Sequence, residues 1–486
     1  MINHRSHAMG VACALALTGC VSMAPNYARP EAPVPAIVGS TGGTMQASEM
    51  PAQLDWRQVL MDARLQQVVA LALDNNRDLR VAGLNIEQAR AQYRIQRADL
   101  FPAVDATVSH SAQRLPAATS FTSEPLILRN ATGQVGISNW ELDLFGRIRS
   151  LKNQALESYL AAEQTQRSTR LSLVAEVASG WLTVCADQQR LSLARQTLDS
   201  QRKTLRLTEL QHDNGIVSGL DLAQIQTSVE SARADVASFT TQLAQSQNAL
   251  NLIVGAEVPQ ALLPAADAID SSVSLAPLPV QLESRVLLQR PDVLSAEHAL
   301  KAANADIGAA RAAFFPTISL TGTAGRGSDA LSSLFDGDHI WSFVPSVTLP
   351  IFRAGALKAE LDVAKLQKDV TVAQYELAIQ TAFREVADVL AERTQLDERM
   401  DAQRALVEAS QRGYTLAEAR YRNGIDSALV ALDAQRSLYG AQQALISLQL
   451  TEAGNRVTLY KVLGGAADAQ SGKTQPLVQH ESPRTP

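Results

Sequence analysis

The sequence predicts a mainly helical α+β chain that arose by internal duplication, with one β-hairpin and one pair of very long helices in each half. The first observation is composition: 46% of the residues are hydrophobic but only 5% are aromatic, as in long helices packed through alanine and leucine. The second is a set of matching motifs in the two halves. The third is that proline is missing from two stretches of about 65 residues, each long enough for a helix of roughly 100 Å.

The first residues have the pattern of a bacterial lipoprotein signal. An apolar run at residues 9–17 is too short to span a membrane and ends in Leu17-Thr18-Gly19-Cys20, which resembles a lipobox. We therefore expect residues 1–19 to be removed and Cys20 to carry an N-acyl chain and an S-diacylglycerol. The alternative is an ordinary secretory signal with a chance cysteine. Val21, in place of an aspartate, resembles the residue found in lipoproteins sorted to the outer membrane.

The rest of the chain offers little for catalysis or for nucleic-acid binding. A net charge of −6 gives no basic field, so we expect no nucleic-acid partner. The seven histidines are scattered, and no metal-binding cluster or nucleophile motif is present, so the sequence predicts no catalytic residue, no metal and no cofactor beyond the lipid. Cys185 is expected to be a small buried hydrophobic residue.

The two halves share motifs in the same order, which indicates a duplicated unit. We expect a lipidated, extended segment at residues 20–55, a first repeat at 56–260, a second repeat at 261–465 and a flexible tail at 466–486. The matches are Asp78 with Asp292, Arg97 with Arg311, Phe101-Pro102 with Phe315-Pro316, Leu142-x-Leu144-Phe145 with Leu349-x-Ile351-Phe352, Asn214-Gly215-Ile216 with Asn423-Gly424-Ile425, Gln226 with Gln435, and Gly255 with Gly464.

Each repeat is expected to contain three helices. The first ends at a Phe-Pro pair, because proline disfavours the helical conformation in the residue before it. Apolar residues spaced alternately by four and three predict a coiled-coil seam on the last helix of the first repeat, from Ile225 to Ile253, and a shorter seam from Leu171 to Cys185. The predicted helices cover residues 78–100, 147–212 and 219–254 in the first repeat and 292–314, 356–423 and 427–463 in the second.

A β-hairpin is expected between the first and second helix of each repeat. Alternating apolar and polar residues predict hairpins over about 103–144 and 317–352, with polar loops near 115–131 and 326–339. The alternation changes phase after Ile137, which indicates a bulge or a strand that leaves the sheet.

Four strands are too few to close a barrel, and open strand edges are not tolerated in lipid. The strands must therefore be pooled between copies: two chains would give eight strands, and three would give twelve, which leave room for a pore. Aromatic residues near the predicted strand ends, such as Trp140 and Trp341, fit a girdle at a bilayer interface, although aromatic residues also simply favour strands.

Several motifs together resemble those of the TolC-type outer-membrane factor family, in its NodT- or OprM-like lipoprotein branch. The resemblance covers nearly the whole chain after Cys20. The motifs are Pro25-Asn26-Tyr27-Ala28-Arg29-Pro30, Trp140-Glu141-Leu142-Asp143-Leu144-Phe145-Gly146, Gln289-Arg290-Pro291-Asp292, Tyr421-Arg422-Asn423-Gly424 and Leu432-Asp433-Ala434-Gln435-Arg436.

This resemblance implies a homotrimer in the bacterial outer membrane. A 12-stranded β-barrel, with four strands from each chain, would continue into a long periplasmic α-helical barrel, and the lipid on Cys20 would add an anchor in outer-membrane lipid. The family forms the exit duct of tripartite efflux systems. The implied partners are a periplasmic adaptor (membrane fusion protein) and an inner-membrane pump of the resistance-nodulation-division (RND) type, and the implied cargo is small molecules or drugs.

The resemblance also places a candidate gate at the turns between paired helices. Asn214, Gly215, Asn423 and Gly424 suit tight turns and, by resemblance, contact the adaptor. By motif match, Tyr421, Asp221 and Asp433 occupy positions like those of the family's constriction, and Asp426 and Arg422 complete the candidate gate. Because Asp426 stands where some members carry a basic residue, we expect either Arg422 or Arg420 to pair in its place. Structural alternatives are that Asp433 caps or pairs along its helix and that Asp221 caps a helix near Gly219.

Two further functions remain open from the sequence. One is the outer-membrane component of a type I protein secretion system, against which the lipobox at Cys20 argues mildly. The other is a coiled-coil lipoprotein that acts as a spacer between membranes, which would explain the heptads but not the paired hairpins. An enzyme is disfavoured because no catalytic motif is present.

Overall fold

The computed structural model describes residues 22–38, 55–120, 124–265, 268–273 and 282–465. Cys20, the predicted signal peptide and the predicted tail lie outside the described residues. The chain divides into two compact units. The sheet unit takes its described residues from 1–32, 84–164 and 294–377, and the helical unit takes its own from 33–83, 165–293 and 378–486. Each unit therefore combines segments from both halves of the sequence.

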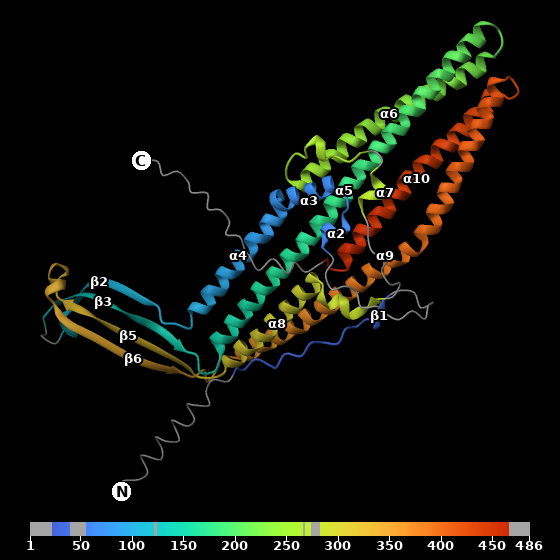
Figure 1. Cartoon of the computed structure of the whole chain (residues 1–486). Coiled ribbons are helices and arrows are strands. Elements are labelled where there is room, and N and C mark those ends of the chain that lie inside the picture. Colours follow the sequence, from blue (N-terminus) through green and yellow to red (C-terminus); the bar gives the residue numbers. More distant parts are fainter. Residues whose placement is uncertain (1–21, 39–54, 121–123, 266–267, 274–281, 466–486) are drawn as a thin grey trace. The chain divides into compact units, whose positions relative to one another are not determined.

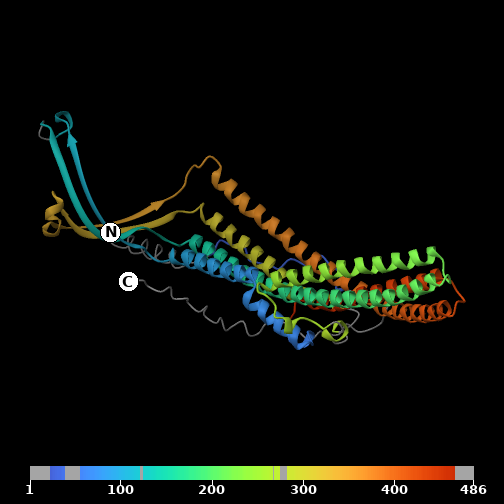
Figure 2. The ribbon, with the colours of Figure 1, turned by 90° about the horizontal axis from the view of Figure 1, so that it is seen from above.

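The sheet unit contains four antiparallel strands, β2 (Val104–Leu115), β3 (Leu126–Leu142), β5 (Thr317–Ser328) and β6 (Asp338–Thr348), in the order β2-β3-β5-β6 (Figure 1). The two predicted hairpins thus pair with each other through β3 and β5. The β2–β3 hairpin extends beyond the β5–β6 hairpin at the loop end (Figure 2).

Two details of the strands can be compared with the prediction. The loops near 115–131 and 326–339 were predicted too long, because their polar residues still pair in the ladder, as in Asn130 opposite Ser111. The predicted irregularity after Ile137 is confirmed. The register of β3 against β5 shifts between Ile137 and Trp140, and Asn139 has a positive φ of 52°. This bulge lets the apolar residues on both sides of it stay on one face of the sheet.

The helices that precede the hairpins are α4 (Arg77–Ala98) and α8 (Pro291–Ala312). Both end earlier than the predicted residues 100 and 314. The chain leaves each helix through a turn in which the backbone N–H of the phenylalanine before proline donates to the helix end, from Phe101 to Ala98 at 2.9 Å and from Phe315 to Ala312 at 3.0 Å. The extended conformation that proline requires therefore begins within the Phe-Pro motif itself.

The long helices are continuous, as predicted. Helices α5 (Arg147–Asp213) and α9 (Ala356–Arg422) contain 67 residues each, and α6 (Gly219–Val254) and α10 (Ala428–Val462) follow them. Their bounds differ from the predicted ones by one residue at most. None of the helices among the described residues has both the length and the hydropathy to cross a membrane.

Shorter elements complete the described chain. They are β1 (Ile37–Val38), which pairs with β4 (Leu282–Glu283), the helices α2 (Trp56–Val59), α3 (Ala63–Asn75) and α7 (Ile269–Ser272), and the 3₁₀-helices η1 (Ala117–Thr119), η2 (Gln260–Leu262), η3 (Ser284–Gln289) and η4 (Leu331–Asp336).

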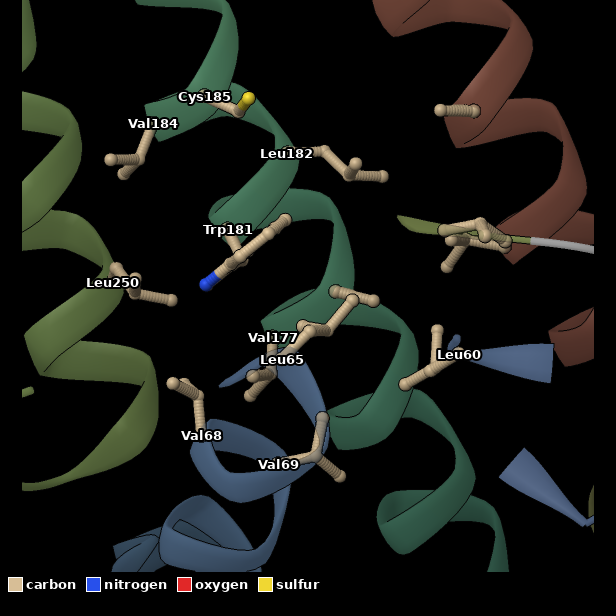
Figure 3. Packing of buried hydrophobic residues seen from close by; sticks show 14 of the residues in the cluster. Leu60, Leu65, Val68, Val69, Val177, Trp181, Leu182, Val184, Cys185 and Leu250 are labelled. Carbon is tan, nitrogen blue, oxygen red and sulfur yellow. The ribbon is translucent and has the colours of Figure 1, made fainter. Parts of the chain in front are cut away.

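The core of the helical unit forms where the middle of α5 meets α3 and α6 (Figure 3). Trp181 is fully buried and packs in one cluster with Leu65 of α3 and Leu250 of α6. Its indole N–H donates to the backbone carbonyl of Leu262 at 3.0 Å, which satisfies the one polar atom of the side chain. Cys185 is fully buried, as predicted.

The predicted seam on α6 is confirmed, since Ile225, Val229, Ala232 and Leu250 are all buried. The seam predicted on α5 is only part of what that helix buries. Val177, Leu182 and Val184 are buried as well, in a cluster that also takes residues from α3, α6 and α10 (Figure 3). The spacing of apolar residues alone predicts one buried face of a helix, but it does not predict that other helices surround α5 on several sides.

In the sheet unit, the N-terminal segment at residues 22–30 lies along α8. The backbone carbonyls of Met23 and Pro25 accept hydrogen bonds from Arg311 at 3.1 Å and from Asn304 at 2.8 Å. Further along, Arg29 forms an ion pair of 2.6 Å with Glu297, whose side chain is only 3% exposed. The chain that follows the predicted lipidation site is thus fixed by successive polar contacts to one helix.

Candidate functional site at the helix turns

Two turns, between α5 and α6 and between α9 and α10, lie at the same end of the helical unit (Figure 1). They are built alike. Gly215 and Gly424 have φ of +71° and +72°, a conformation that a side chain would strain. The preceding asparagines each donate a side-chain hydrogen bond to a carbonyl four residues back, at 2.6 Å for Asn214 and 2.7 Å for Asn423. The duplicated Asn-Gly motif thus encodes two copies of one helix ending.

The first turn is held by a capping box. Ser218 is the N-cap of α6, and its hydroxyl accepts a hydrogen bond from the backbone N–H of Asp221 at 3.2 Å. The carboxylate of Asp221 accepts in return from the backbone N–H of Ser218 at 3.2 Å. Asp221 therefore occupies the third position of the helix and completes the capping box, while Ser218, and not Asp221, is the N-cap itself.

The second turn uses an ion pair instead. Ser427 precedes α10 without a side-chain cap. Arg420 contacts Asp426 through two nitrogens, Nε at 2.6 Å and Nη2 at 2.9 Å. The hydrogen bond from Arg420 holds the pKa of the Asp426 carboxyl below its usual value. Arg420, one of the two arginines expected to take over the role of the missing basic residue, thus pairs with Asp426 itself.

Arg422 contacts a different residue. Its guanidinium lies 2.6 Å from the carboxylate of Glu418, one helical turn earlier on α9. Glu418 was not predicted as a partner, although its spacing of four residues from Arg422 is the spacing at which opposite charges meet on a helix.

Tyr421 connects two helices beside the predicted gate. It is 7% exposed and packs against Ile225, Ala428 and Leu432. Its hydroxyl lies 3.0 Å from the hydroxyl of Thr208 on α5. This contact joins α9 to α5 next to the turns. No sequence pattern pointed to Thr208, because Ala417 stands at the equivalent position of the second repeat.

A groove of about 300 Å³ lies beside Tyr421 and is lined by residues of α5, α6, α9 and α10. Deeper along the same helices, Gln201 donates to Gln435 at 2.6 Å, so a second polar contact links α5 to α10. Asp433, on the turn of helix before Gln435, is exposed and makes no hydrogen bond or ion pair within the described part of the chain. The predicted constriction residues therefore divide into a buried connector, Tyr421, and charged groups at the surface.

The turns also expose apolar side chains in matched pairs. Ile216 and Ile425, one residue after the turn glycines, are 70% and 62% exposed, and Leu220 and Leu429 are 68% and 53% exposed. Large apolar residues repeated at two turns of one end are typical of a surface that contacts another protein.

Comparison with known proteins gives one consistent result. Residues 68–256 and 282–465 match the family described as outer membrane efflux protein. The chain is 49% identical over 475 residues to two proteins of Pseudomonas putida, the antibiotic efflux pump outer membrane protein ArpC and the toluene efflux pump outer membrane protein TtgC. Each match spans 97% of this chain and 98% of the relative. The solved open state of the Neisseria gonorrhoeae MtrE outer membrane channel is 39% identical, with a TM-score of 0.82 over 92% of this chain and 98% of that one.

These similarities confirm the fold class, the outer-membrane location and the efflux function that the sequence predicts, and they assign the chain to a family of channels and not of enzymes. The family match covers both duplicated halves and includes the two Asn-Gly turns. The chain belongs to the outer membrane efflux protein family.

Proposed function

We propose that three copies of this chain form the exit duct of a tripartite efflux pump, with four strands from each copy closing one barrel in the outer membrane. The observation that carries the proposal is the sheet order β2-β3-β5-β6, which leaves β2 and β6 with one unpaired edge each among the described strands. In lipid, unpaired backbone N–H and C=O groups have no water to bind and are costly. Pairing β2 of one copy with β6 of the next removes every edge.

The two faces of the sheet support this arrangement. Side chains alternate between the faces along each strand, and residues paired across the ladder share a face. The apolar face carries Val104, Ala106, Val135, Ile137, Leu320, Ala324, Trp341, Phe343 and Val347, and the polar face carries Thr107, Ser109, Thr132, Gln134, Ser319, Thr321, Thr323, Ser342 and Ser346.

Exposure of the apolar face fits a lipid environment. Trp341 is 78% exposed and Phe343 is 61% exposed in the single chain. Contact with acyl chains would shield both side chains from water, while the polar face would line a water-filled duct.

The remaining parts of the proposal concern anchor, partners and cargo. The lipid on Cys20 would attach the N-terminal segment to the outer membrane, with the long helices extending into the periplasm. A periplasmic adaptor would contact the exposed Ile216 and Ile425 of the turns, and an inner-membrane RND-type pump would supply the energy. The names of ArpC and TtgC refer to antibiotics and toluene. We extend this to small, largely apolar molecules as the cargo here, selected by the pump.

Disulfide cross-linking at the free edges tests the closure. Thr107→Cys in β2 is combined with Ser342→Cys or Ser346→Cys in β6, all on the polar face. If copies pair edge to edge, one of these combinations gives covalent dimers and trimers on a non-reducing gel. The only cysteine among the described residues is the buried Cys185, which gives a low background.

The matched control places one cysteine on an inner strand. Gln134→Cys in β3 with Ser342→Cys in β6 should remain monomeric, because β3 already has a partner on each side. Equal cross-linking by both designs, or none by any edge pair, would contradict the proposed trimer. Single-channel conductance in planar bilayers measures the duct itself.

A further inference from the structure

The charged residues of the four strands are segregated by face. The ladder places Arg326 opposite His339 and Gly133, and Gly133 opposite Val108, so these residues share the apolar face. Counting by twos along β2 and β3 adds His110, Arg114 and Arg129 to the same face. We call Arg326, His339, His110, Arg114 and Arg129 the cationic belt. The three acidic residues of these strands, Asp105, Glu141 and Asp338, all lie on the polar face.

The cationic belt is confined to the loop half of the sheet. In the other half, the apolar face continues through Ala324, Leu320 and Ile318 on β5 without a charged residue. A cation on a lipid-facing surface is costly at the bilayer centre but not at the headgroups. In the proposed barrel, the belt would therefore stand where the apolar band ends and the headgroups begin.

A hollow adjoins the belt on the same face. The helix η4 folds over the sheet and packs Leu334 onto Gly133, where an added Cβ would lie 3.2 Å from the leucine Cδ2. Between η4 and the strands is a hollow of about 280 Å³, lined by apolar side chains that include Val108, Val135, Ala324, Leu334 and Phe335. Its size and lining suit a section of an acyl chain.

Arg326 stands beside this hollow with part of its guanidinium free. Its Nη1 donates to the backbone carbonyls of Phe335 at 2.5 Å and Gly337 at 3.3 Å, which fixes η4 in place. Nε and Nη2 have no partner within the described residues, and together they form the edge of a guanidinium that binds two oxygens of a phosphate. The side chains of Arg114, Arg129, His110 and His339 are likewise unpaired in the described part of the chain.

We propose that the apolar face binds a phosphate-bearing anionic lipid, with an acyl chain in the hollow beside η4 and the phosphate at Arg326 and the neighbouring belt. The inference rests on the proposed function, because it requires the apolar face to look into the bilayer. The absence of acidic residues from this face of the described strands removes repulsion of the phosphate. The combination of an apolar hollow and an adjacent cation matches a lipid better than a free anion, which would gain nothing from the hollow.

Native mass spectrometry of the full-length trimer in a non-ionic detergent tests the site. The probes are phosphatidylglycerol, which is anionic, and phosphatidylcholine with the same acyl chains, which is zwitterionic. The wild type should retain phosphatidylglycerol preferentially. The double variant Arg114→Gln with Arg129→Gln should lose that preference, by roughly 5-fold in affinity for each arginine. These arginines are chosen because, unlike Arg326, they do not hold η4.

The matched control removes two charges from the other face, with Asp105→Asn and Asp338→Asn, and should leave the preference unchanged. Equal retention of both lipids by the wild type overturns the site. So does loss of preference in the control rather than in the double variant. Full displacement of the lipid by inorganic phosphate would show a simple anion site and also overturns it. Conductance of the same preparations separates the two hypotheses: a conducting trimer without lipid preference contradicts only this site, whereas a wild type that forms no channel contradicts the proposed function.

Discussion

The guanidinium of Arg420 lies against the carboxylate of Asp426, with two nitrogen–oxygen distances of 2.6 and 2.9 Å. This ion pair is present in the turn between α9 and α10 and has no counterpart among the described residues of the duplicated turn between α5 and α6. The equivalent positions of the first turn hold Gln211 and Val217, and that turn is stabilised by the Ser218–Asp221 capping box instead. The two turns thus have similar backbone geometry but should respond differently to pH and to mutation.

Asp426→Asn should loosen the second turn alone. Because the pKa of Asp426 is lowered, the contribution of the pair is complete above the ordinary aspartate pKa and is lost as the pH falls through the lowered value. Hydrogen exchange should show faster exchange at residues 423–427 in the variant, and no change at residues 214–218. Arg420→Gln should give the same result, and the double variant no more. Arg422→Gln, which breaks only a pair within α9, is the control. Equal changes in exchange at both turns would contradict the conclusion that the Arg420–Asp426 pair stabilises only the second turn.

Tyr421→Phe should favour the open channel if the turns close the duct. The variant removes the contact with Thr208 and keeps the packing against Ile225 and Leu432. A hydrogen bond of this kind contributes about 1 kcal/mol, so the ratio of open to closed states should rise about fivefold. Thr208→Val should have the same effect, and the double variant should not exceed either single one. The measurement is single-channel recording.

The control for this cycle is Tyr414→Phe. The hydroxyl of Tyr414 lies 3.5 Å from that of Ser200, at the limit of hydrogen bonding, although it borders the same groove. Its removal should leave gating almost unchanged. Additive effects of Tyr421→Phe and Thr208→Val would show that the two hydroxyls act separately.

The comparison of sequence and structure shows which features follow from local pattern. The change of phase after Ile137 predicted either a bulge or a strand that leaves the sheet, and the structure has the bulge, beside Asn139. The Asn-Gly turns follow from backbone geometry alone. The choice of Arg420 over Arg422 could not be predicted, because both arginines lie near Asp426 in sequence and only the direction of each side chain from α9 decides. The contact between Thr208 and Tyr421 depends on how α5 is rotated about its axis relative to α9, and no local sequence pattern predicts that rotation.

Gly325→Ala should prevent correct assembly of the sheet, while Gly327→Ala should not. An added Cβ at Gly325 would lie 2.0 Å from the backbone carbonyl oxygen of Gly133 on the neighbouring strand, so the ladder itself would have to move. At Gly327 the nearest atom is the end of the Ile340 side chain at 3.5 Å, an ordinary contact. We expect a cost of about 1–3 kcal/mol or more for the first variant and little for the second. The yield of heat-resistant trimer on a gel checks the difference, and similar yields would argue against this pairing of β3 with β5.

The last prediction concerns the N-terminal segment. Burial of Glu297 favours the neutral acid, but hydrogen bonds from Arg29 and Lys301 hold the pKa of its carboxyl below the usual value. The contribution of the cluster to docking is therefore complete above the ordinary glutamate pKa and is lost as the pH falls through the lowered value. Chymotrypsin cleavage after Tyr27, whose hydroxyl donates to Glu297 at 3.1 Å, reports release of the segment.

Glu297→Gln should make this bond cleavable at neutral pH, where the wild type resists. Gly308→Ala should do the same without changing any charge, because its Cβ would lie 2.8 Å from the backbone nitrogen of Ala24. Asp199→Asn, which removes an exposed ion pair with Lys203 in the helical unit, is the control and should leave the segment protected. Protection that persists in both test variants would mean that neither the ion cluster nor the close fit at Gly308 fixes the segment. The contacts of Met23 and Pro25 with α8 would then suffice to hold the chain next to Cys20.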